Sequence, residues 1–426
     1  MNLLIKSVKI VWENSEFNNQ ILDVHIQNGI IQAIGPNLDF QNLAKQNTEL
    51  WQQEESYLSP GWFDLDANMG EPGFETREDL NSGSNASLRG GFTGIALMPN
   101  SEPPLQSKTQ IEYIVGKSKN LGIDIYPIGT LSKNREGKEM AELFDMFQSG
   151  ALVFCDGDRA VQNSGILLRA LQYSSTFGAK VFSYPEDYDL SGNAKVHEGI
   201  QSLKLGMKGI PNLAEEIMIQ RDLMIASYAN SPIHFITISG AESVELIRQA
   251  KKLGQKVTAS VPSYHLFLED SNLQGFDTNY KVRPPLRGKS DREALLVGIQ
   301  DGTIDAITTR HTPQEPESKE VEFENALDGM ISLETSFSTA LMSLEKLVTI
   351  ERIVNALSFS PRKIMGLSQP ELKVGHIANF CWFDPSKEWI YEKKSIAGKS
   401  SNSPFLGKTL KGKVLGTIHK QISTKF

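Results

Sequence analysis

Three aspartates of this chain lie in segments where carboxylate oxygens could bind a metal: Asp66, Asp156 and Asp158. Carboxylates are ligands for hard cations, so the three could form a weak site for magnesium or calcium. The alternative is that Asp66 or Asp156 forms an ion pair with Arg310 or Arg283, which would neutralise charge in a buried place. We favour the ion pair.

Other reactive groups lie close to these positions along the chain. Cys155 precedes Asp156 directly, and Glu186 and Asp187 form an acidic pair. A thiol reacts as a thiolate, which a buried apolar environment disfavours, so we expect Cys155 to be inert. We expect the acidic pair to be part of the architecture of the site and not a catalytic dyad.

The bulk composition limits the class of protein. The chain has 426 residues, a net charge of −8 and 39% hydrophobic residues. Phosphate binding requires a basic face, so a nucleic-acid partner is not expected. No apolar run approaches the ~18 residues of a membrane span, and lysines interrupt the first ten residues, which we predict to be a strand and not a signal peptide. Two cysteines give no disulfide framework and indicate a cytoplasmic protein.

Short strands separated by turn residues are predicted at both ends of the chain. They cover residues 3–35 and the stretch from about residue 373 to the end. Between them, apolar strand candidates alternate with segments of helical periodicity, such as residues 243–253 and 291–300. The strand candidates are residues 94–98, 123–128, 150–154, 180–183, 232–236, 256–259 and 304–308. Repeated strand–helix units predict an α/β fold, in which a parallel barrel is flanked by a β domain made from both termini.

Several blocks match the motifs of one enzyme family in that family's order. They are residues 60–79, 98–100, 209–216, 282–287, 301–305, 329–335 and 403–407. Together they closely resemble dihydroorotase, of the longer type associated with multienzyme pyrimidine complexes, over nearly the whole chain. The resemblance implies a TIM (β/α)8 barrel with a smaller β-sandwich domain formed from both chain termini. We therefore expect residues 59–368 to form the barrel, and residues 1–58 and 369–426 to form the β domain.

The resemblance also implies a zinc centre, and this chain has lost most of its ligands. The family's opening motif, Asp-x-His-x-His-x-Arg, supplies two zinc-binding histidines and an arginine that holds the substrate's carboxylate. Six positions of this chain correspond to the family's metal ligands. Asp66 and Asn68 stand in place of those two histidines, and Tyr184 and Thr237 in place of two further histidines. Asp156 stands at the bridging carboxylate, and Arg310 replaces an aspartate that also serves as base. Only the bridging position keeps a residue of the family's ligand type, Asp156, and the nearby Asp158 leaves the register at this position open.

Hydrolysis of a cyclic amide near neutral pH requires a metal-bound hydroxide and a nearby base. Arg310 places a permanent cation where a carboxylate should face the metal. None of the seven histidines occupies a ligand position. We therefore expect no cofactor, and zinc only if a relocated site exists.

Positions that the resemblance assigns to the substrate have changed as well. Gly70 stands where the family has its clamp arginine, Gln314 where it has a histidine, and Arg283 where it has an asparagine. Asn100 and His311 keep the family's residues. We interpret Asn100, Arg283, His311 and Gln314 as relics of a substrate site.

The resulting prediction is a catalytically inactive, dihydroorotase-like protein of pyrimidine biosynthesis. Because the family includes inactive relatives that act as scaffolds, the resemblance implies a structural partner of aspartate carbamoyltransferase, in a symmetric homo-oligomeric assembly. Two alternatives remain. One is an active dihydroorotase, or another cyclic amidohydrolase, with an atypical metal site. The other is a non-hydrolysing binder in which Arg310, Arg283 and Asn100 hold an anionic pyrimidine precursor.

Overall fold

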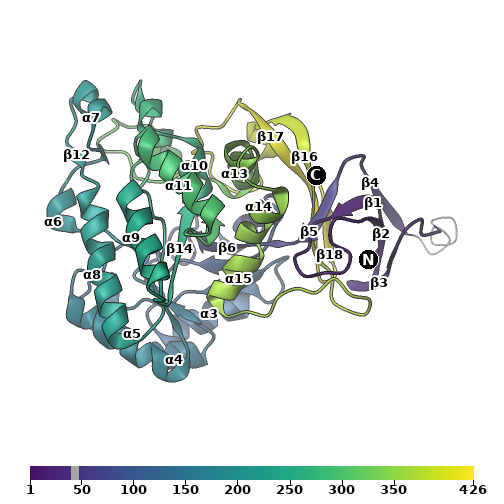
Figure 1. Cartoon of the computed structure of the whole chain (residues 1–426), viewed down its shortest axis with the longest axis horizontal. Helices are drawn as coiled ribbons and strands as arrows, with labels where there is room; N and C mark the ends of the chain where they lie inside the picture. Colours follow the sequence, from purple (N-terminus) through teal and green to yellow (C-terminus); the bar gives the residue numbers. More distant parts are fainter. Residues whose placement is uncertain (40–47) are drawn as a thin grey trace.

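Both ends of the chain enter one eight-stranded sheet in the computed structural model, which describes residues 1–39 and 48–426 (Figure 1). Its strands are β1 (Asn2–Ile10), β2 (Ile21–Gln27), β3 (Ile30–Gly35), β4 (Glu49–Gln52), β5 (Tyr57–Pro60), β16 (Asn379–Ile390), β17 (Thr409–His419) and β18 (Ile422–Lys425). Antiparallel pairing of β16 with β5 joins the C-terminal strands to the N-terminal ones. Trp51 and Trp382 stack with ring centroids 5.4 Å apart in the core of this sheet, so each terminal segment completes the core of the other.

Eight parallel strands close into a barrel beside this sheet. They are β6 (Trp62–Ala67), β7 (Phe92–Leu97), β8 (Asp124–Pro127), β9 (Val153–Phe154), β10 (Lys180–Ser183), β13 (Ile233–Phe235), β14 (Val257–Pro262) and β15 (Ala306–Thr308). Two parallel bridges complete the ring. Gly129 with Phe154 joins β8 to β9, and Ala67 with His311 joins the ends of β6 and β15.

Helices cover the outside of the barrel and bury an apolar layer against its strands. They are α2 (Leu80–Arg89), α3 (Lys108–Ser118), α4 (Leu143–Gln148), α5 (Ser164–Phe177), α8 (Leu213–Ala229), α9 (Ala241–Lys252), α11 (Lys289–Asp301), α13 (Ser336–Leu344), α14 (Ile350–Leu357) and α15 (Phe359–Met365). Shorter pieces occupy the connections: α6 (Tyr188–Ser191), β11 (Val196–His197), α7 (Ile200–Leu205), β12 (Gly209–Ile210), α10 (Ser263–Phe267) and α12 (Pro316–Lys319).

The architecture agrees with the fold class predicted from the sequence. Each of the seven strand candidates overlaps a barrel strand, and the segments 243–253 and 291–300 coincide with α9 and α11. The first residues of the chain form β1, as expected. In the described part of the chain, no helix combines the length and the apolar character that a membrane span requires.

Candidate functional site

The six predicted site positions follow the C-terminal ends of barrel strands, the end at which TIM barrels carry their active sites. Asp66 and Asn68 lie at the end of β6, Asp156 after β9, Tyr184 after β10, Thr237 after β13 and Arg310 after β15. The fold therefore brings residues from distant parts of the sequence to one face. Four of them meet in what we call the central cluster: Asp66, Tyr184, Thr237 and Arg310.

A buried ion pair forms the middle of the central cluster. The Arg310 Nη1 atom donates to both carboxylate oxygens of Asp66, at 3.1 and 3.2 Å. The Thr237 hydroxyl donates to Asp66 Oδ2 at 2.8 Å. The side chains of Arg310 and Asp66 are 5% and 0% exposed. This is the pairing that we favoured from the sequence.

Tyr184 covers the cation from one side. The Arg310 guanidinium carbon lies 5.3 Å from the centre of the Tyr184 ring, and the phenol donates to Glu186 Oε2 at 3.1 Å. Burial raises the pKa of Tyr184 well above its ordinary value, so the ring stays neutral. Burial opposes the charge on Arg310, but Asp66 raises the pKa of Arg310 above its ordinary value. The cluster is thus a neutral ion pair packed against a neutral ring.

The residues at this face do not fit the zinc centre of the family. Both oxygens of Asp66 contact Arg310, whose cation would repel a divalent metal. Asp156 is turned away, because its carboxylate accepts from the backbone N–H groups of Leu131 and Ser132 at 2.9 and 2.8 Å. Within residues 1–39 and 48–426, no three His, Cys, Asp or Glu side chains are arranged to hold a metal.

The magnesium or calcium site considered from the sequence is therefore not formed. Asp158 is exposed and pairs with Arg135, and Asp156 pairs with neither Arg310 nor Arg283. Two backbone N–H groups in the loop after β8 bind the Asp156 carboxylate more directly than a distant guanidinium could. Asp156, the one position that kept a ligand-type residue, consequently supports a neighbouring loop.

The segment after Asp66 is held by contacts with neighbouring segments of the chain. The Asn68 amide donates to the His311 carbonyl at 3.2 Å and to Thr312 Oγ1 at 3.1 Å. Gly70 has φ +66°, and a Cβ there would lie 2.5 Å from the carbonyl oxygens of Phe74 and Glu78. The position of the clamp arginine therefore has no room for any side chain.

The four substrate relics are held by partners within the protein. Arg283 binds Glu186 through two nitrogens, with Nε to Oε2 at 2.9 Å. Gln314 donates to the Asp328 carbonyl at 2.8 Å, His311 Nδ1 accepts from the Ser332 N–H at 3.2 Å, and Asn100 Oδ1 accepts from the Asp158 N–H at 3.4 Å. The pairing of Glu186 with Arg283 was not predicted from the sequence. The sequence did contain a signal for it, because Arg283, which replaces a family asparagine, and the acidic Glu186 both map to the C-terminal end of the barrel.

Two members of the central cluster have strained backbones. Thr237 has φ 57° and Arg310 has φ 50°. A β-branched residue at positive φ is a clear outlier, and each such residue costs about 1–3 kcal/mol. The hydrogen bond and the ion pair to Asp66 hold both residues in these conformations.

Cys155 is buried beside the cluster. The Gly157 N–H donates to its sulfur at 3.2 Å, and burial raises the pKa of the thiol to about 12. This environment agrees with the inert thiol that we expected.

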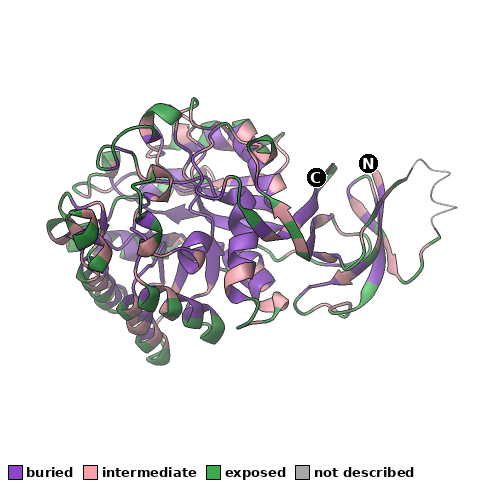
Figure 2. Ribbon diagram, turned by 90° about the horizontal axis from the view of Figure 1, so that it is seen from above, coloured by how far each residue is buried: buried purple, intermediate pink, exposed green. Residues whose placement is uncertain are grey.

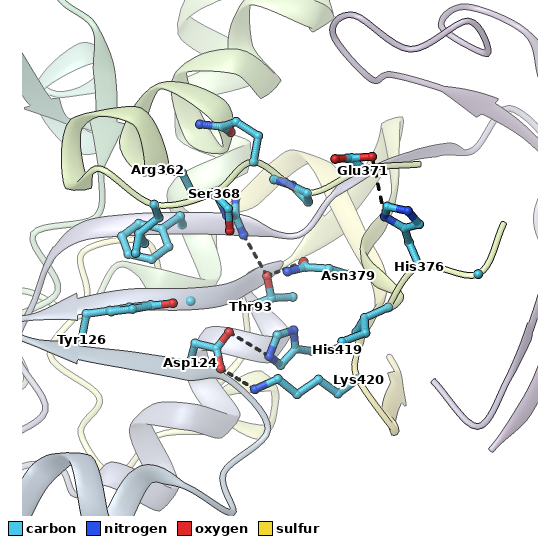
Figure 3. A pocket seen from close by; sticks show the side chains of 17 residues that line it. Thr93, Asp124, Tyr126, Arg362, Ser368, Glu371, His376, Asn379, His419 and Lys420 are labelled. Carbon is cyan, nitrogen blue, oxygen red and sulfur yellow. Dashed lines mark hydrogen bonds and ion pairs between the residues drawn. The ribbon is translucent and has the colours of Figure 1, made fainter. Parts of the chain in front are cut away.

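A pocket of about 590 Å³ lies at the opposite end of the barrel, where β6, β7 and β8 begin (Figure 3). Asp124 lies there between His419 and Lys420, at 3.3 and 2.6 Å. Arg362 is buried against neutral acceptors, including Thr93 Oγ1 at 3.3 Å, and burial lowers the pKa of Arg362 to about 10. This pocket was not predicted from the sequence, because its walls come from distant segments, namely the barrel strands and the C-terminal part of the chain.

Comparisons of the sequence with known proteins identify one family, and comparison with solved structures shows the fold. Residues 56–243 match the family model described as dihydro-orotase-like. A dihydroorotase of Trichlorobacter lovleyi is 36% identical over 420 residues, covering 98% of each chain. A dihydroorotase of Citrifermentans bemidjiense is 38% identical over 422 residues, covering 99% of this chain and 98% of its own. Among solved structures, the L-hydantoinase of Arthrobacter aurescens superposes with a TM-score of 0.84 at 20% identity, covering 100% of this chain and 96% of its own, which shows a common fold.

Proposed function

This chain belongs to the dihydroorotase family, and we propose that it is a member without hydrolytic activity that works in pyrimidine biosynthesis as a partner protein. The observation that carries the proposal is the buried ion pair of Asp66 with Arg310. It lies where the family's metal and base would have to be, so the group needed to attack the substrate's ring is replaced by a neutral, desolvated contact.

The whole barrel mouth supports the same proposal. Hydrolysis of a cyclic amide needs a hydroxide generated at neutral pH and a base that accepts the proton released by the attacking water. Asp66 could serve as neither while both of its oxygens bind Arg310 and one also binds Thr237. Asp156, the other carboxylate at a ligand position, is bound by two backbone N–H groups.

The pyrimidine role rests on relatives that are named dihydroorotase and aligned over the full length of this chain. A partner role explains how the fold could persist without its chemistry, because barrel packing and surface contacts do not require a metal. By resemblance to the family's inactive members, we propose that the partner is aspartate carbamoyltransferase, the enzyme of the preceding step.

The two alternatives have less support. An active enzyme with an atypical zinc site would need ligands that converge, and none do so in the described residues 1–39 and 48–426. A binder of an anionic precursor would need free cations, yet Arg310 and Arg283 are neutralised by Asp66 and Glu186.

The first test is an assay of dihydroorotate hydrolysis, and of its reverse with carbamoyl aspartate, on the purified chain supplied with zinc. The dihydroorotase of Trichlorobacter lovleyi, purified in the same way, is the positive control. We expect no turnover from this chain, whereas ordinary enzymes turn over at about 1–1,000 per second. Turnover that follows the protein through purification and stops with a chelator would overturn the proposal.

The partner is tested separately, by mixing the chain with aspartate carbamoyltransferase from the same organism and measuring the mass of the eluted complex. Stable co-elution, with loss of the carbamoyltransferase's assembly or activity when this chain is removed, is the expected result. Separate elution at all concentrations would reject this partner and leave the prediction of inactivity in place.

A further inference from the structure

A buried arginine without a counter-charge lies in the wall of the pocket at the N-terminal end of the barrel (Figure 3). In the described part of the chain three arginines are buried: Arg287, Arg310 and Arg362. Arg287 forms an ion pair with Glu215 at 3.4 Å, and Arg310 forms one with Asp66 at 3.1 Å. Arg362 is 5% exposed, yet no carboxylate of the described residues lies within 4.0 Å of its guanidinium nitrogens. Its charge is therefore not balanced by a neighbouring carboxylate, as the charges of the other two are.

The hydrogen-bond partners of Arg362 in the described chain are neutral groups. Its Nη1 atom donates to the carbonyl and the hydroxyl of Ser358, at 3.1 and 2.8 Å, and Nη2 donates to Thr93 Oγ1 at 3.3 Å. The guanidinium carbon lies 5.5 Å from the centre of the Phe63 ring. A guanidinium has five N–H donors, and at most three of them have an acceptor among the described residues. The Nε–H and one N–H of Nη2 are left for a further acceptor.

The two acidic side chains of the pocket have other partners. Asp124 lies 2.6 Å from Lys420 and 3.3 Å from His419. Glu371, whose side chain is largely exposed, lies 3.7 Å from His376. The carboxylates of the pocket are thus paired at its surface, and they do not supply the charge that the buried arginine lacks.

Arg362 stays charged in this environment. Burial lowers the pKa of Arg362 only to about 10, which is well above neutral pH. A buried charge without a partner destabilises a fold, so such groups are normally paired. Exceptions to this rule are expected at functional sites. An anion in the pocket would supply the missing counter-charge.

The rest of the pocket is suited to a small organic molecule. Its volume of about 590 Å³ lies within the ~300–1,000 Å³ of ligand pockets. Its wall combines the apolar side chains of Leu367, Pro370 and Ile377 with the polar groups of Tyr126 and Asn379. A bare inorganic ion would leave most of this space and the apolar part of the wall without contacts.

We propose that this pocket binds a small organic anion and that Arg362 holds its carboxylate or phosphate group. The planar fork of a guanidinium matches the oxygens of both groups, which makes arginine the usual residue for such recognition. The ligand would contact the first residues of the barrel strands β7 and β8, the segment after α15 and the strands β16 and β17. The pocket lies at the end of the barrel opposite to the central cluster, so the proposal does not depend on whether the chain hydrolyses dihydroorotate.

Binding to the purified full-length chain tests the proposal with two matched pairs of probes. Orotate differs from uracil by a carboxylate, and uridine 5′-monophosphate differs from uridine by a phosphate. Isothermal titration calorimetry at constant ionic strength should detect binding of at least one of the two anions and much weaker binding of its neutral counterpart. The anion that binds identifies the group that the pocket accepts. Binding of neither anion at millimolar concentration would overturn the proposal.

The variant Arg362→Met assigns the binding to this pocket. It removes the charge and keeps an unbranched side chain against Phe63, so anion binding should weaken about 10- to 100-fold. Without ligand, the variant should unfold at the same temperature as the wild type or higher, because an unpaired buried charge has been removed. An arginine with a purely structural role would lower the unfolding temperature when replaced. Unchanged binding by Arg362→Met would place the anion at another site and overturn the proposal.

A second variant gives the same test without changing a buried residue. Lys420 is at the rim of the pocket with a side chain that is 56% exposed, so Lys420→Glu should fold normally and repel the anion. We expect about 2- to 10-fold weaker binding. Lys252→Glu, which makes the same charge change at an exposed position of α9 outside the pocket, is the control and should bind as the wild type does. Equal binding by the two variants would contradict the assignment.

Discussion

The central cluster and the exposed side of α8, which carries Leu213, Ile217, Met224 and Tyr228, differ in both charge and exposure to solvent. At the barrel mouth, where a substrate must enter, Asp66 and Arg310 are buried and bound to each other. On the outer side of the barrel, where charged side chains normally face the solvent, α8 has only uncharged side chains at its exposed positions. The difference teaches that charge and exposure do not go together in this molecule, because charge is buried and paired at the barrel mouth and absent from an exposed helix surface.

The largest expected effect comes from breaking the ion pair at the central cluster. Asp66→Asn would leave Arg310 buried without a counter-charge, which costs about 3–5 kcal/mol of unfolding free energy. Urea denaturation followed by circular dichroism measures this loss. The matched double variant Asp66→Leu/Arg310→Met removes both charges and should be as stable as the wild type, or up to about 4 kcal/mol more stable. A loss below about 1 kcal/mol in Asp66→Asn would mean that water reaches the pair.

A second effect at the same face depends on pH. Burial raises the pKa of Asp64 to about 7, whereas an unfolded aspartate titrates near 3.9. Between these values the folded protein holds a proton that the unfolded chain releases, so the unfolding free energy falls as pH rises from about 4 to 7. One such group contributes at most about 1.4 kcal/mol per pH unit.

Urea denaturation at pH 5, 6 and 7 gives the slope of the unfolding free energy against pH for the wild type and for Asp64→Asn. The difference between the two slopes is the contribution of Asp64. Asparagine can still accept from the Thr309 N–H, which lies 2.9 Å from Asp64 Oδ1. The corresponding variant Glu334→Gln calibrates the measurement, because burial also raises the pKa of Glu334 to about 7. Equal slopes in wild type and Asp64→Asn would contradict the prediction.

The exposed side of α8 should affect stability only through association of chains, since the family resemblance implies a homo-oligomer. Substitutions at exposed positions usually change the unfolding free energy of a monomer by less than about 0.5 kcal/mol. An oligomer is stabilised by mass action, so the thermal midpoint of the wild type should rise with protein concentration. The midpoint of Ile217→Lys/Met224→Lys should not change with concentration. Scanning calorimetry at several concentrations distinguishes the two, and the same concentration dependence in both proteins would contradict association through α8.

The smallest expected effect is the absence of a thiol reaction. Cys155 and Cys381 are buried, and burial raises the pKa of each thiol. Ellman's reagent should therefore release no signal from the native chain and two equivalents in urea. The exposed Val374→Cys variant should add one rapid equivalent in the native state. A fast reaction of the native wild type would mean that the protein opens at Cys155 beside the central cluster or at Cys381 in β16.

Much of the fold could be predicted because its signals are local. Apolar strands at regular intervals predicted the barrel, and turn residues near both termini predicted the strands of the β domain. The extent of β9 was not predictable, since the apolar run 150–154 contains only a two-residue strand, Val153–Phe154. The number of residues that pair with neighbouring strands depends on the position of those strands in the barrel and not on the apolar sequence of the segment.

The central cluster was only partly predictable. Opposite charges at Asp66 and Arg310 favoured their pairing, and the structure contains it. The orientation of Asp156 depends on two N–H groups of the 131–132 loop, which carry no sequence signal. The exposed side of α8 was not predicted either, because apolar residues occur on both sides of this helix and the sequence does not say which side faces the barrel.

On the proposal that hydrolysis was lost, Gly70 makes the loss difficult to reverse in evolution. An arginine regained at this position would place its Cβ against the carbonyl oxygens of Phe74 and Glu78, and it would also have to adopt a positive φ. The loop would have to be remodelled before the old side chain could be accommodated, and before any regained ligand could be useful to selection. The early steps of such a return carry a folding cost without a catalytic benefit. A lineage that has reached this glycine is therefore expected to find new uses for the barrel more readily than it recovers the old one.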